Sequence, residues 1–235
     1  MHARNAAAVA AVGTLAVGIV SIPAAPAHAA DTITASDQAY FGYYGFDRAR
    51  VKGYTGKGVT IAMIDGKVDT SVPELAGADI SVTIPCTITT LPSVESHGTG
   101  VASILVAPGY GVAPDATLLA YQMSLGANGD VYGNDCTDNH GNVRTRYSWL
   151  FNQAMNDGAQ IINLSATSHD FDNQTKWTVA RAISQQVILV NGAGNDSKSD
   201  DDAALSKWSG VVGVSAIGVD DNRQDYSSWG QGVVT

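Results

Sequence analysis

The sequence predicts a three-layer α/β/α fold built around a mostly parallel β-sheet. Short apolar runs rich in β-branched residues recur along the chain, as in buried parallel strands. Amphipathic stretches with a helical period separate these runs, so strands and helices alternate. This alternation implies right-handed crossovers between parallel strands, with helices covering both faces of the sheet.

The central predicted strand is the run from Gly58 to Asp65, which is apolar until it stops on an acid. A carboxylate at the carboxyl tip of a buried strand lies where open α/β sheets hold their functional groups. We expect the stretch from 76 to 95 to be irregular. Further strands are predicted at 117–123, 161–165, 187–191 and 211–217.

A helix is predicted to begin at His97, with Ser96 as its cap. Its apolar periodicity predicts that Val101, Ile104 and Leu105 form the buried face. Two more amphipathic helices are expected, at 148–156 and 175–186. Their predicted inward residues are Leu150, Ala154 and Met155 in the first, and Trp177, Ala180 and Ile183 in the second.

Length and composition favour one domain with a sizeable core, because 45% of the 235 residues are hydrophobic. The 13 Lys and Arg against 22 Asp and Glu give a net charge of −9. A nucleic-acid partner is not expected of so acidic a chain. We interpret the charge as favouring solubility.

The first 29 residues have the pattern of a secretory signal peptide. A short basic start is followed by an apolar stretch and by Ala27-His28-Ala29, which has the small-x-small form of a cleavage site. We expect cleavage after Ala29, a secreted mature domain over 30–235, and no membrane contact after cleavage. The competing interpretation is an uncleaved anchor, against which the short apolar run and its interruption by Pro23 and Pro26 argue.

The two cysteines, Cys86 and Cys136, fall in loops on either side of the His97 helix. In an oxidising compartment such a pair is more often a disulfide than two free thiols. His140, with Asp135 and Asp138, permits a metal cluster around Cys136 as an alternative. We expect the disulfide.

Four segments in order resemble the motifs of the subtilisin family (subtilases) of serine peptidases. They are the strand ending at Asp65, the run from Ser96 to Ser103, the run from Gly158 to Ser165, and the run from Val187 to Asn195. His97 follows Asp65 by 32 residues, a separation that is recognised from the family. The resemblance extends from about Tyr43 to the last residue.

The resemblance implies the catalytic roles of three residues. Asp65 would orient the His97 ring, and His97 would act as the base that a serine hydroxyl needs to become a nucleophile. Imidazole suits this role because its unperturbed pKa of about 6.5 lets it accept and return a proton. Asn195 would donate its amide to the developing oxyanion. The alternative for Asn195 is a turn cap.

The nucleophile expected from the family would lie about 65 residues after Asn195, beyond Thr235. No Gly-Thr-Ser-Met-Ala block occurs in the chain. The favoured hypothesis is therefore a secreted subtilisin-like endopeptidase whose domain is incomplete at the C-terminus. The alternative is a catalytically dead, truncated subtilase that serves as a binding module or has no function.

The family also implies a substrate-binding rim and a specificity pocket for polypeptide substrates. The expected substrate-binding residues are Leu125, Gly126 and Gly129 on the rim, and Ser165, Ala166 and Gly192 at the pocket. We expect the domain to be a monomer.

Several features depart from the family pattern. Lys67 stands beside the catalytic acid where a glycine is usual, and Gly100 replaces a second histidine. We expect no folding prodomain between the signal peptide and the domain. The turn Ala107–Tyr110 is short where many relatives bind calcium, so we expect no metal and no cofactor. An acidic loop formed by Asp196 and 200–202 is the remaining calcium candidate, and we interpret it as solvated.

Overall fold

The computed structural model describes residues 33–85, 92–123, 147–166, 171–199, 204–230 and 233–234. All of them lie within one compact unit, Thr32–Thr235. The proposed signal peptide (1–29) and both cysteines of the predicted disulfide, Cys86 and Cys136, lie outside the described residues.

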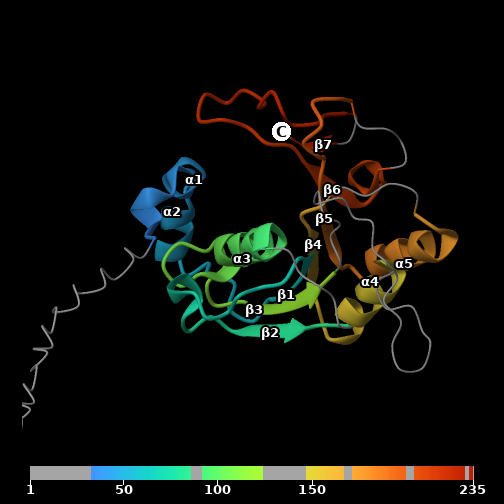
Figure 1. Ribbon diagram of the computed structural model, residues 1–235, viewed down its shortest axis with the longest axis horizontal. Coiled ribbons are helices and arrows are strands. Elements are labelled where there is room, and N and C mark those ends of the chain that lie inside the picture. The colour runs from blue at the N-terminus through green and yellow to red at the C-terminus, as the bar shows by residue number, and fades with distance from the viewer. Residues whose placement is uncertain are drawn as a thin grey trace, which may run out of the picture. The chain divides into compact units, whose positions relative to one another are not determined.

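The described strands form one seven-stranded parallel sheet in the order β2-β3-β1-β4-β5-β6-β7 (Figure 1). The predicted α/β fold with a mostly parallel sheet is confirmed, and each of the five predicted strands is present. The strands are β1 Thr60–Asp65, β2 Ile80–Thr83, β3 Thr117–Gln122, β4 Ile161–Leu164, β5 Ile188–Gly192, β6 Val211–Val214 and β7 Val233–Val234.

The strand β2 corrects the prediction that the stretch from 76 to 95 is irregular. This strand is only four residues long, and none of its side chains is fully buried. It pairs with β3 alone, at the edge of the sheet. A short edge strand needs no continuous apolar run, so the sequence carries no clear periodic signal for it.

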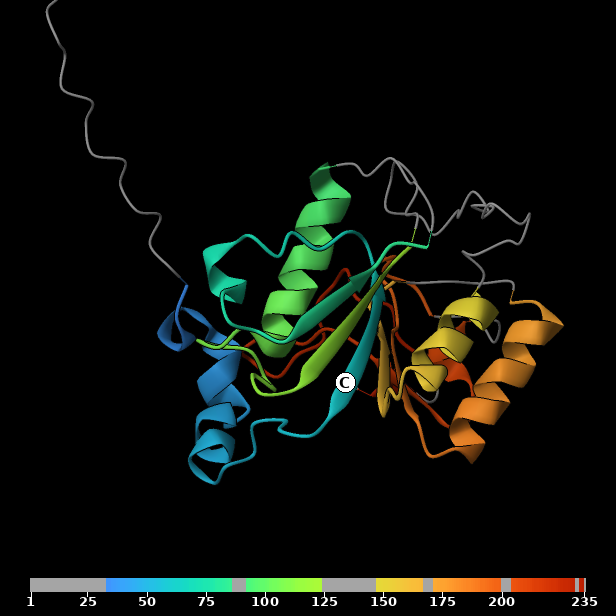
Figure 2. The same ribbon diagram turned by 90° about the horizontal axis from the view of Figure 1, so that it is seen from below.

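Helices cover both faces of the sheet. Figure 2 shows α3 on one side, and α4 and α5 together on the other. Two short helices precede β1 in a segment for which no helix was predicted. The helices are α1 Ala39–Tyr43, α2 Phe46–Val51, α3 Pro92–Val106, α4 Tyr147–Asn156 and α5 Asn173–Ser184.

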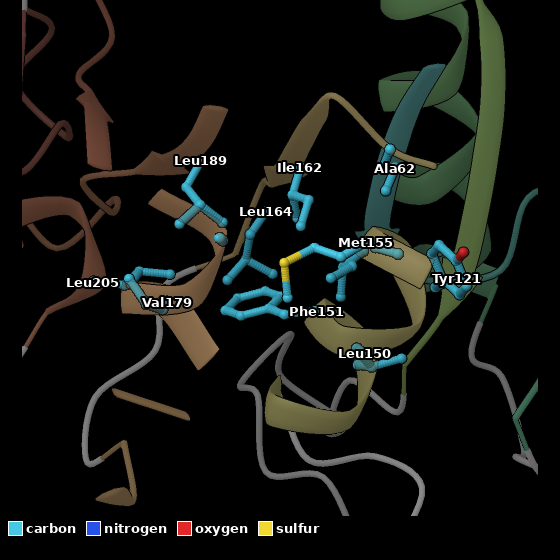
Figure 3. Packing of buried hydrophobic residues seen from close by; sticks show 14 of the residues in the cluster. Ala62, Tyr121, Leu150, Phe151, Met155, Ile162, Leu164, Val179, Leu189 and Leu205 are labelled. Carbon is cyan, nitrogen blue, oxygen red and sulfur yellow. The ribbon is translucent and has the colours of Figure 1, made fainter. Parts of the chain in front are cut away.

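The central strand β1 contributes to hydrophobic clusters on both faces of the sheet. Ala62 and Ile64 pack on the side of α4, and Ile61 and Met63 pack on the side of α3. Figure 3 shows the first cluster, in which side chains from α4 meet those of the strands. Because both faces are covered at β1, its sequence is continuously apolar, whereas a strand with one wet face would alternate.

The observed α3 differs from its prediction in both its start and its buried face. It begins at Pro92, so Ser96 lies inside the helix and does not cap it. Ile104 is 47% exposed. The buried positions are mostly small residues, because this helix lies close to the backbone of a neighbouring segment. They are Val94, Gly98, Ala102, Ser103 and Val106.

The prediction for the inward face of α5 was wrong, whereas that for α4 is confirmed. Trp177 is 77% exposed, and Ala180 and Ile183 also face solvent. Asp172 begins the helix by accepting a hydrogen bond from the Thr175 amide at 2.7 Å. The buried residues of α5 are Thr175, Thr178, Val179 and Ala182, and those of α4 include Leu150, Ala154 and Met155.

No helix in the described part of the chain is long and apolar enough to cross a membrane.

Candidate active site

Asp65 is the last residue of β1, and its side chain is fully buried. Its carboxylate oxygen Oδ1 lies 2.7 Å from Nδ1 of His97, near the start of α3. The backbone amide of Gly66 donates to the same oxygen at 2.6 Å. A buried acid and a half-exposed imidazole are thereby joined in a fixed geometry.

Two glycines allow the chain after Asp65 to lie directly against α3. A Cβ atom at Gly66 would be 2.4 Å from the carbonyl oxygen of Val94. A Cβ at Gly98 would be 2.6 Å from the carbonyl oxygen of Lys67 and 2.7 Å from that of Gly66. Contacts shorter than 3.0 Å are not tolerated against backbone atoms. The two glycines therefore set how closely the acid approaches the helix that carries His97.

The hydrogen bond to Asp65 raises the pKa of His97 above its ordinary value, while partial burial of the ring lowers the pKa to a smaller extent. With Nδ1 directed at a carboxylate, the neutral ring carries its proton on Nδ1 and leaves Nε2 as the free base. This is the tautomer that a general base requires.

The second carboxylate oxygen of Asp65, Oδ2, is buried and has no hydrogen-bond partner. Leaving a buried polar atom unpaired costs free energy, and such costs concentrate at functional sites.

The carboxyl ends of β4 and β5 bring the predicted pocket residues together. Leu164 and Asn191 are paired in the register, so Ser165 follows β4 at the same edge where Gly192 ends β5. The Asn163 amide donates to the Ser165 hydroxyl at 2.9 Å. Ser165, Ala166 and Gly192 are all partly exposed, and their role in a specificity pocket stays a prediction.

Asn191 positions the backbone at the end of β4, and this role was not predicted from the sequence. Its buried side-chain amide donates to the carbonyl oxygens of Leu164 at 2.9 Å and Ala166 at 2.8 Å. The amide thus fixes the backbone on which Ser165 lies. The sequence does contain a signal for this role, because a lone asparagine inside the apolar run of β5 must find hydrogen-bond partners.

Asn195 lies three residues after β5, beyond Gly194, which has a φ angle of 103°. Its side chain is exposed and has no hydrogen bond to another described residue. The structure gives no contact between Asn195 and His97. The roles assigned to Asp65, His97 and Asn195 stay predictions, although the first two are in contact.

Three predicted rim residues, Leu125, Gly126 and Gly129, lie outside the described residues. Within the described ranges, no group of three or more His, Cys, Asp or Glu side chains could hold a metal ion. The candidate acidic loop at 200–202 is not covered by that finding.

The fold resembles that of solved protease structures. The solved structure of the self-cleaved protease domain of PatA shares 26% identity and superposes with a TM-score of 0.57, covering 76% of this chain and 65% of that chain. The psychrophilic subtilisin-like protease Apa1 from Pseudoalteromonas sp. AS-11, at 18% identity, has the same fold, with a TM-score of 0.63 over 81% of this chain and 44% of that chain.

The sequence model of the Subtilase family matches residues 56–234, and the chain belongs to this family. Subtilisin E of Bacillus subtilis (strain 168) is 27% identical over an alignment of 190 residues that covers 76% of this chain and 46% of that protein. The minor extracellular protease Vpr of the same organism is 34% identical over an alignment of 169 residues that covers 65% of this chain and 20% of that protein. The chain thus spans about half the length of subtilisin E and less of Vpr.

Proposed function

We propose that this protein is a secreted serine endopeptidase that cleaves peptide bonds through an Asp-His-Ser triad. The observation that carries the proposal is the 2.7 Å contact between the buried Asp65 carboxylate and His97 Nδ1 at the carboxyl edge of the sheet. The similarity to subtilisin E supports the same reaction class. The proposed nucleophile is a serine C-terminal to Thr235 in the full-length protein.

In this mechanism the work is divided among three groups. His97 Nε2 takes the proton from the serine hydroxyl as it attacks the scissile carbonyl, and returns it to the leaving amine. Asp65 holds the ring and stabilises the imidazolium that forms. Asn195 would donate to the oxyanion, and loss of one such donor in a related enzyme costs roughly 2.7–4 kcal/mol.

The proposed substrates are polypeptides, held at the edge where β4 and β5 end. Ser165 and Ala166 would lie on one wall of the specificity pocket and Gly192 on the other. The Asn191 side chain supports this proposal, because it fixes the backbone of the first wall through its bonds to Leu164 and Ala166. Leu125, Gly126 and Gly129 are proposed to pair with the substrate backbone.

The same proposal covers secretion, the disulfide, the oligomeric state and the need for cofactors. Residues 1–29 direct secretion, the oxidising compartment allows Cys86 and Cys136 to pair, and the mature protein is a monomer. The proposed reaction needs no metal or cofactor, so a strong chelator should leave activity unchanged. The extracellular relative Vpr supports the proposed location.

The proposal is tested with a fluorophosphonate probe on the protein made from its full coding sequence. We expect covalent labelling of one serine located after residue 235, together with cleavage of an unfolded polypeptide. His97→Ala should abolish both, because the serine then has no base.

Two controls separate the proposal from its competitor. The 235-residue chain should not be labelled, since it contains no nucleophile block. A full-length protein that folds but is neither labelled nor active, and that binds polypeptides, would overturn the proposal in favour of a binding module. Labelling that persists in His97→Ala would remove His97 as the base.

A further inference from the structure

An ion pair joins the segment after Asp65 to the first turn of α3. Lys67 Nζ lies 2.6 Å from Glu95 Oε1, and both side chains are partly exposed. The bond to Glu95 raises the pKa of Lys67 above its ordinary value, so Lys67 is cationic at neutral pH. The proposed catalytic roles leave both residues without an assignment.

The segment from Asp65 to Asp69 contacts α3 on two sides of the helix. On one side Asp65 meets His97. On the other, Lys67 meets Glu95, and the Asp69 amide donates to the Thr99 hydroxyl at 2.9 Å. Glu95 and Thr99 are four residues apart and so share a face, whereas His97 is directed about 200° away from Glu95 around the helix.

Between these contacts the carbonyl oxygens of Gly66 and Lys67 lie over Gly98. The segment therefore contacts α3 at His97 on one side and at Glu95 on the other, and it lies against Gly98 between these two contacts. A displacement of the Lys67 flank has to be taken up by the backbone next to Asp65, because the centre is already in close contact. This coupling links the ion pair to the contact between Asp65 and His97.

We propose that the Lys67–Glu95 ion pair is a positioning clamp that fixes Asp65 against His97. The proposal rests on the proposed peptidase function only for its effect on activity. Its effect on the contact itself is measurable without any turnover. Lys67 and Glu95 act through Asp65 and do not touch the reacting atoms.

A clamp and a simple charge effect predict different results. The charged groups on the segments packed against this part of α3 are Asp65, Lys67, Asp69, Glu74 and Glu95. If the pair acted on His97 only through its charges, removing Lys67 would leave Glu95 unbalanced and raise the pKa of His97. If the pair is a clamp, removing Lys67 weakens the hydrogen bond between His97 and Asp65, and the pKa of His97 falls.

The experiment is an NMR titration of His97 in the full-length protein carrying ¹³C-labelled histidine, assigned with His97→Gln. We expect Lys67→Met and Glu95→Gln both to lower the pKa of His97. Lys67→Arg keeps the pair and should leave the pKa unchanged. Lys57→Met removes an exposed lysine that has no ion-pair partner among the described residues, and is the matched control for the change in net charge.

The charge-reversed double variant Lys67→Glu with Glu95→Lys rebuilds the pair in the opposite sense. A clamp predicts that the pKa of His97 returns toward that of the unmodified protein. Opposite shifts in the two single variants, no shift, or no recovery in the double variant would each overturn the proposal. In an active protein the single variants should lower kcat/KM by up to about fivefold, the value of an exposed ion pair.

If the unmodified protein shows no peptidase activity, the proposed function fails, but the titration still tests the clamp. If it is active and the titration shows no change, the clamp fails alone.

Discussion

At the scale of single residues, the contact between Asp65 and His97 determines how the site should respond to pH. The hydrogen bond between His97 and the Asp65 carboxylate raises the pKa of His97 above its ordinary value of 6.5. Because only the neutral ring can accept a proton, we expect kcat/KM to rise with pH through a midpoint above 6.5. The pH dependence of fluorophosphonate labelling measures this midpoint directly.

The control for this prediction is Asp65→Asn, which should move the midpoint to lower pH and lower kcat by roughly 10⁴-fold. An unchanged midpoint would show that the raised pKa does not come from Asp65. The same contact has the opposite effect on stability. Its contribution is complete below pH 6.5 and is lost as the pH rises through the folded-state pKa of His97.

Some residues of the candidate site could be found from the sequence and others could not. Asp65 and His97 stand out because a buried strand ends on an acid, and because a family spacing links the two. The partnership of Lys67 with Glu95 could not be predicted, since it depends on how the chain turns after β1. Asn191 needed only the rule that a polar side chain inside a buried strand must be satisfied.

At the scale of elements, two glycines of α3 provide a matched pair of substitutions. Gly98→Ala should destabilise the protein by about 1–3 kcal/mol, because its Cβ would overlap two backbone carbonyls of the preceding loop. Gly100→Ala meets nothing within 4 Å and should stabilise the helix by about 0.5–1 kcal/mol. Denaturant unfolding of each variant measures both effects.

The pair is informative because helix propensity alone predicts a gain at both positions. Equal stabilisation by the two alanines would contradict the close approach of the segment after Asp65. In that case the Asp–His geometry would have to be held by other contacts.

The predictions for the elements succeeded where burial is complete and failed where it is partial. The strands flanking β1 read as apolar runs because helices cover them. The helix faces of α3 and α5 were misjudged because the large residues Ile104 and Trp177 were assumed to point inward. The true contact faces consist of glycine, alanine, serine, threonine and valine, whose side chains are smaller than those of Ile104 and Trp177, so the helices approach closely but give a weak periodic signal.

At the scale of the whole molecule, the two faces of the sheet are covered unequally. The register places Ile61, Ile161 and Ile188 on the same face, and this face is covered by α3 only over the neighbouring strands β1 and β3. Across β5 and β6, side chains on this face are exposed in the described part of the chain. The side chains exposed there are Ile188 at 50%, Val212 at 41% and Val214 at 44%.

We expect the 235-residue chain to bind a hydrophobic dye at this open face, as exposed apolar patches do. The double variant Val212→Ser with Val214→Thr should reduce dye fluorescence. Val219→Ser is the control, since Val219 is 78% exposed but lies outside the strands. Dye binding that is equally weak in all three proteins would show that the face is covered in solution.

The position of β1 in the middle of the sheet has a consequence for how the chain acquires its structure during synthesis. Ile61 of β1 is paired with Ile161 of β4, a partner 100 residues later in the sequence. Folds dominated by such distant pairings form slowly, because a long loop must close before the pairing is rewarded. During synthesis on the ribosome, one edge of β1, including the edge at Asp65, stays unpaired until β4 has emerged. Synonymous codon changes that slow translation between 123 and 161 should therefore prolong this exposed state and lower the yield of soluble protein, with the sequence of the product unchanged.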